Sequence, residues 1–63
     1  MSATRYTATA TREGRWWIVA IPALDGLTQS RRLAGIQRAA REYIAVTLDV
    51  PVNQVDLDMT VSG

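Results

Sequence analysis

Residues 5–21, with the sequence RYTATATREGRWWIVAI, contain two strand patterns separated by a short polar break. Over residues 5–11, threonine alternates with small or aromatic residues, and a period of two is typical of a strand with one buried face. Residues 15–21 are rich in aromatic and β-branched side chains, which also favour a strand. Gly14 can take the positive φ angle of a tight turn, so the whole stretch predicts an antiparallel hairpin.

Two adjacent tryptophans, Trp16 and Trp17, lie in the second strand pattern. Because neighbouring side chains of a strand point to opposite faces, only one of them can point into the main core. We expect the other to lie exposed beside alanine and threonine side chains, where an indole makes a good contact for another molecule. The sequence leaves open which of the two is exposed.

The chain changes direction after the hairpin. Pro22 ends the second strand, and residues 22–26 predict a loop in which Gly26 adopts a conformation that other residues avoid. We expect a short third strand at residues 27–29.

The hydrophobic pattern changes its period after this third strand. Apolar residues recur at three- and four-residue steps from Leu33 to Leu48, which predicts an amphipathic helix of about 16 residues. Ser30 is its predicted N-cap, and Pro51 stops it. Residues 54–62 alternate again, with acidic and hydroxyl side chains on one side and apolar ones on the other, and predict a last strand.

The predicted order of strand, strand, strand, helix and strand defines an α+β fold: a four-stranded mixed sheet with one helix packed on one face. The connection through the helix lets the last strand lie beside the first and parallel to it, by a right-handed crossover. The helix-covered face is then the core. The opposite face carries threonines, one tryptophan, Asp56 and Asp58, and we expect this face and the two sheet edges to be docking surfaces.

Length and composition limit the classes of protein. Sixty-three residues make a single small domain, and 48% hydrophobic residues with a net charge of +1 are typical of a folded globular chain. So short a chain buries only about 60% of the surface of its unfolded form, so we expect a homodimer or a larger oligomer. The sequence starts without a basic-then-apolar leader, and Pro22 interrupts its longest apolar run, so a cytoplasmic protein is expected.

Charge is distributed unevenly along the chain. Residues 1–41 hold all seven arginines and two acids, a net charge of +5, whereas residues 42–63 hold four acids and no base, a net charge of −4. Two interpretations remain open. The charges form ordinary solvated faces, or they form a dipolar surface that steers self-association or a charged partner.

Single residues along the chain resemble those of one family. They are Tyr6, then Glu13-Gly14 followed by an aromatic strand ending in Pro22, then Gly26 with Thr28-Gln29 two residues on, then a leucine-led helix. From about Tyr6 to Val61, this pattern is similar to the HicB-like antitoxin domain, most closely its short actinobacterial form. The family commonly has a proline before the loop glycine and a glycine after the Thr-Gln pair, where this chain has Asp25 and Ser30.

The resemblance implies a truncated ribonuclease H-like fold and the role of an antitoxin in a type II toxin–antitoxin system. Such domains usually neutralise a small, basic HicA-like ribonuclease toxin by masking its active site. Many members also carry a C-terminal ribbon-helix-helix or helix-turn-helix segment that binds DNA. We expect a single HicB-like domain over residues 1–63 without that segment, so operator binding is not expected.

Three classes of function fit parts of the sequence. Without cysteine and histidine, catalysis is limited to carboxylate-bound metals, and Asp56 and Asp58 without a third ligand make a poor site, so neither an enzyme nor a cofactor is expected. A nucleic-acid-binding module would use arginines for phosphates and an exposed tryptophan for stacking, but a net charge of +1 disfavours it. A protein-binding module, with a small core and free sheet edges, fits best.

The predicted partner contacts come from the tryptophan pair, the segment after Pro22 and the acidic side of the last strand. They are Trp16, Trp17, Asp25, Gly26, Thr28, Gln29, Asp56 and Asp58. The acidic residues would meet a basic, RNA-binding partner by charge complementarity. Each residue also has an ordinary structural explanation, since a strand tryptophan is commonly core and a loop glycine commonly serves a turn.

Overall fold

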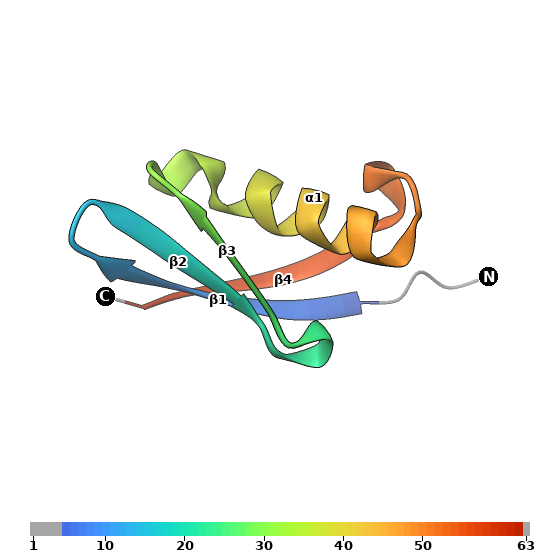
Figure 1. The fold of residues 1–63 in the computed structure, drawn as a ribbon, viewed down its shortest axis with the longest axis horizontal. Coiled ribbons are helices and arrows are strands. Elements are labelled where there is room, and N and C mark those ends of the chain that lie inside the picture. The colour runs from blue at the N-terminus through green and yellow to red at the C-terminus, as the bar shows by residue number, and fades with distance from the viewer. Residues whose placement is uncertain (1–4, 63) are drawn as a thin grey trace.

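The computed structural model describes residues 5–62 of the chain. Its main elements are β1 (Arg5–Glu13), β2 (Trp16–Ile21), β3 (Gly26–Ser30), α1 (Ile36–Leu48) and β4 (Asp56–Ser62). Short 3₁₀ segments lie between them, namely η1 (Pro22–Leu24), η2 (Leu33–Gly35) and η3 (Val52–Gln54). The strands form one sheet and α1 lies across one of its faces (Figure 1), which confirms the predicted α+β architecture. No helix within residues 5–62 is long and apolar enough to cross a membrane.

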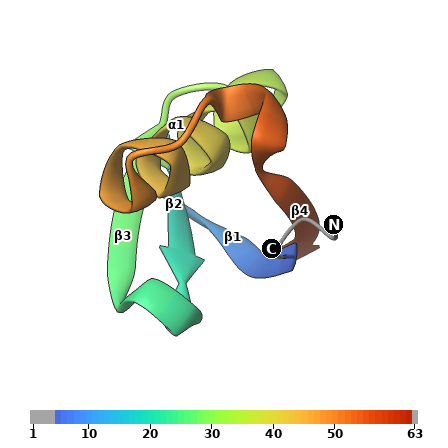
Figure 2. The same ribbon diagram turned by 90° about the vertical axis from the view of Figure 1, so that its right-hand side faces the viewer.

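The strands are arranged in the order β3-β2-β1-β4. β2 pairs antiparallel with both β1 and β3, whereas β4 pairs parallel with β1. The connection through α1 therefore returns the chain to the far side of β1, as predicted from the element order. β3 and β4 are the two edges of the sheet, with α1 above it (Figure 2).

β1 and β2 form a hairpin with a two-residue turn. Gly14 and Arg15 make this turn, between the paired residues Glu13 and Trp16. Gly14 has a φ angle of 63°, and a positive φ at the first turn residue suits the right-handed twist of a two-residue hairpin. The turn therefore forms where the strand patterns and the glycine predict it.

The core lies between α1 and the sheet. Its members are fully or almost fully buried apolar residues from β1, β2, α1 and the position just before β4: Ala8, Ala10, Val19, Ile21, Ile36, Ala40, Ile44, Ala45 and Val55. Burial alternates along β1 and β2, which confirms that one face of each strand packs against the helix.

The helix begins later than the sequence predicts. It has 13 residues, and Gly35 occupies the N-cap position without a side-chain cap. Ser30 is instead the last residue of β3, and its hydroxyl accepts a hydrogen bond from the Arg32 N–H at 3.3 Å and donates one to the Arg32 carbonyl at 2.9 Å. The prediction of Ser30 as the N-cap is therefore wrong. Its hydroxyl bonds the backbone of Arg32 in a local turn, and Arg32 itself has an extended and not a helical backbone.

Gly26 is needed for a different reason from the predicted one. The left-handed backbone at this corner belongs to Asp25, with a φ angle of 51°, whereas Gly26 has no positive φ. The Tyr43 ring of α1 lies directly over Gly26, where a Cβ atom would stand 2.8 Å from Tyr43 Cζ and 2.9 Å from its Oη. Gly26 therefore allows a close approach of the helix to β3 and is not the strained residue of the turn.

Candidate functional site

The face of the sheet opposite α1 is not covered by any element among residues 5–62 (Figure 2). We call it the open face. It is formed by alternate residues of each strand, which the register aligns in rows, and these are Arg5, Thr7, Thr9, Thr11, Glu13, Trp16, Ile18, Ala20, Leu27, Gln29, Asp56, Asp58, Thr60 and Ser62. It has an apolar side over β2 and β3 and a polar side over β1 and β4.

The apolar side of the open face is built around Trp16. This indole is 37% exposed, and Leu27 of the neighbouring strand is 67% exposed. The guanidinium carbon of Arg31 stands 5.2 Å from the centroid of the Trp16 ring, within the range of a cation–π interaction. Ile18 lies between these residues and is half-buried.

The two tryptophans divide as the alternation predicts, and the structure identifies each. Trp16 points to the open face, and Trp17 is half-buried and packs against the core on the helix side. Trp17 lies two positions before the core residue Val19 in β2, so both side chains point to the same face. Its strand neighbours, Arg12 and Ser30, are on that face too. Trp16 is therefore the tryptophan available to a partner.

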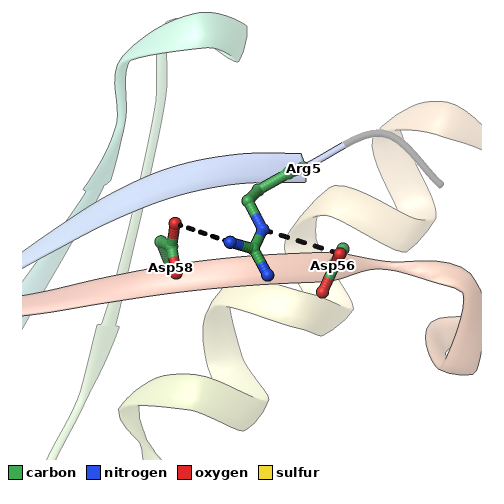
Figure 3. A network of polar contacts seen from close by, with 3 residues as sticks. All are labelled: Arg5, Asp56 and Asp58. Atoms are coloured by element: carbon green, nitrogen blue, oxygen red, sulfur yellow. Dashed lines mark hydrogen bonds and ion pairs between the residues drawn. The ribbon is translucent and has the colours of Figure 1, made fainter. Parts of the chain in front are cut away.

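The polar side of the open face contains an arginine between two carboxylates (Figure 3). Arg5 Nε lies 3.6 Å from Asp56 Oδ2, and Arg5 Nη1 lies 3.3 Å from Asp58 Oδ2. Parallel pairing produces this arrangement, since it aligns Arg5 with Asp56 and Thr7 with Asp58. The predicted acidic patch therefore has a net charge of −1 and not −2.

Arg5 is the residue of this cluster that sequence reasoning missed. A signal was available, because Arg5 shares the strand parity of Thr7 and the last strand was expected beside the first. Among residues 5–62, no group of three or more histidine, cysteine, aspartate or glutamate side chains is arranged to hold a metal ion.

The Arg5 cluster should contribute little to stability. Its side chains are about half exposed, and exposed ion pairs are worth at most about 1 kcal/mol. We expect Arg5→Ala to lower the free energy of unfolding by about 0.5 kcal/mol, with a smaller effect in high salt. Urea melts of both proteins at low and high salt measure this. A loss above about 2 kcal/mol would contradict it and make the cluster a structural element.

The remaining predicted contacts lie along or beside the edge strand β3, and only Gln29 among them belongs to the open face. Asp25 is exposed at the start of β3, and Gln29 is exposed near its end. Thr28 is half-buried on the helix side, and Gly26 is buried beneath Tyr43. A shallow groove runs between this edge and α1, lined by Thr28, Gln29, Ala39, Glu42, Tyr43, Val46 and Thr47. The predicted contacts thus fall into two surfaces, the open face and the β3 edge.

Comparison with known proteins finds no family model that matches the chain and no significant match among curated proteins or solved structures.

Proposed function

We propose that this protein is an antitoxin-like binding protein that neutralises a small, basic HicA-like ribonuclease by covering its active site. The main support is the apolar side of the open face, where Arg31 stacks on Trp16 and Leu27 is exposed farther along β3. Tryptophan and arginine are the residue types that most often dominate binding energy at interfaces. The strand-strand-strand-helix-strand order, which the resemblance to HicB-like antitoxins implies, is consistent with this role.

The polar side of the open face suits a basic partner. Among residues 5–62, the exposed side chain of Arg5 is the one cation paired with Asp56 and Asp58, and exposed ion pairs cost little to rearrange. A lysine or arginine of the partner can therefore replace Arg5 beside either carboxylate. Inhibition of this kind is steric and needs no catalytic group from the antitoxin.

Nucleic-acid binding is the alternative function, and the Trp16–Arg31 pair is the observation that favours it. An exposed indole stacks on bases of any sequence, and an adjacent guanidinium contacts phosphates. The two functions differ in their response to salt. Binding through phosphates weakens steeply as salt rises, whereas a protein interface centred on a buried indole does not.

The test combines capture of the partner with a matched pair of tryptophan variants. Tagged protein is used to capture its partner from the native host at moderate salt, and the captured protein is assayed as a ribonuclease with increasing amounts of the purified chain. We expect Trp16→Ala to weaken inhibition by about 30-fold or more, as for an interface hot spot, with a smaller fall in the thermal midpoint than Trp17→Ala. Trp17→Ala should lower the thermal midpoint, because Trp17 packs against the core.

Three outcomes would contradict the proposal. The chain could capture no ribonuclease, it could capture one that it does not inhibit, or Trp16→Ala could inhibit as well as the wild type. Recovery of oligonucleotides that are lost when salt is raised would support the nucleic-acid alternative.

A further inference from the structure

The outer edge of β3 is open to pairing. Within the described part of the chain, β3 is bonded to β2 alone, so the backbone N–H and C=O groups of alternate β3 residues point outward without a neighbouring strand. Natural proteins usually protect such an edge with charged residues, proline or a bulge. The five residues Gly26–Ser30 include neither charge nor proline, whereas the opposite edge, β4, carries Asp56 and Asp58.

We propose that two copies of this protein associate through antiparallel pairing of their β3 edges. A two-fold axis perpendicular to the sheet relates the two copies. Residues paired across this axis must point to the same face of the sheet, so their numbers are both odd or both even. The register that uses the whole strand is centred on Thr28. It places Thr28 opposite its own equivalent, Leu27 opposite Gln29 and Gly26 opposite Ser30. Threonine pairs across strands are favourable.

Charge complementarity selects this partner and this register. The residues that flank β3 are Asp25 on one side and Arg31 on the other. Centring the pair on Thr28 brings Asp25 of each copy opposite Arg31 of the other, so two opposite-charge pairs close the two ends of the interface. A guanidinium can stack on an aromatic ring and bind a carboxylate at the same time. Arg31 can therefore remain over Trp16 while it pairs with Asp25 of the other copy.

Exposed apolar side chains lie on both sides of the same edge. Leu27 is 67% exposed on the open-face side, and Val46 of α1 is 82% exposed where it lines the groove on the helix side. A second copy at this edge would cover both, which fits the need of so short a chain to bury more apolar surface. The apolar sides of the two open faces would then lie in one continuous sheet.

Charge exchange at the two flanking positions tests the pairing. We expect sedimentation equilibrium to give twice the monomer mass of 6.9 kDa for the wild type at micromolar to millimolar concentrations. Arg31→Glu places two carboxylates opposite each other at each end of the interface and should raise the dissociation constant about tenfold or more. The double variant Asp25→Lys with Arg31→Glu restores opposite charges and should recover most of the loss.

A matched control separates this effect from the overall change in charge. Arg12→Glu makes the same change at an exposed residue of β1, which β2 separates from β3, and should leave the dissociation constant within about threefold of wild type. Thermal melts show whether each variant remains folded. A wild-type monomer at all these concentrations, a dimer that Arg31→Glu leaves intact, or a double variant no better than Arg31→Glu would each overturn the proposal.

The dimer does not rest on the proposed function. The two proposals share Arg31 and Leu27, but Trp16 is assigned to ribonuclease inhibition alone, and self-association is measured on the purified chain without a ribonuclease. The double charge variant restores the dimer whether or not a ribonuclease is bound, so either proposal can fail without the other.

Discussion

Replacing Ile44 with alanine should remove about half of the folding free energy of this protein. Ile44 is fully buried in the middle of α1 and belongs to the same core cluster as Val19 and Ile21 of β2. Truncation of a buried isoleucine to alanine costs about 2–5 kcal/mol, because transfer free energy is lost and a cavity remains. A chain of this length has a total stability of about 3–9 kcal/mol. Urea denaturation followed by circular dichroism measures the loss.

Two further variants grade the effect. Ile44→Val removes one methyl group and should cost about 1 kcal/mol. Leu33→Ala removes as many carbon atoms as Ile44→Ala. Because the Leu33 side chain is 51% exposed, this variant should lose less stability than Ile44→Ala. Equal losses for Ile44→Ala and Leu33→Ala would contradict the described core. Because a dimer raises apparent stability with concentration, all melts should use one low protein concentration.

Gly26→Ala should destabilise the protein by about 1–3 kcal/mol through overpacking. The added methyl group would stand 2.8 Å from Tyr43 Cζ, closer than carbon atoms approach without repulsion. Either the Tyr43 ring moves away from the core or α1 shifts from β3, and each response loses packing. Thermal or urea melts of the variant against wild type measure the cost.

A double-mutant cycle shows whether Tyr43 is the cause. In a Tyr43→Ala background the ring is absent, so Gly26→Ala should cost close to nothing there. The coupling energy should then equal most of the cost of Gly26→Ala alone. If Gly26→Ala costs the same in both backgrounds, the glycine serves the turn itself and the packing explanation is wrong.

The predicted binding residues show the limit of reasoning from the sequence. Alternation shows that only one of Trp16 and Trp17 lies on the core side, but the choice depends on how β2 pairs with both neighbours. Alternation predicts Asp56 and Asp58 on the face opposite the helix, where they lie, but it does not predict that Arg5, more than fifty positions earlier, lowers the net charge of this patch. A hydroxyl just before a helical pattern predicts an N-cap at Ser30, but in the structure this hydroxyl bonds the backbone of Arg32 in a local turn.

The element order, the hairpin turn at Gly14 and the parallel return of the last strand follow from the sequence alone. Periodicity and the backbone preferences of single residues act over a few neighbouring positions, and the parallel return follows from the order of the elements and the usual handedness of crossovers. Only the tertiary structure places Tyr43 over Gly26, Arg31 over Trp16 and Arg5 between two aspartates. Those contacts join residues far apart in the chain, and their partners are chosen by strand register and helix position, which no local pattern specifies.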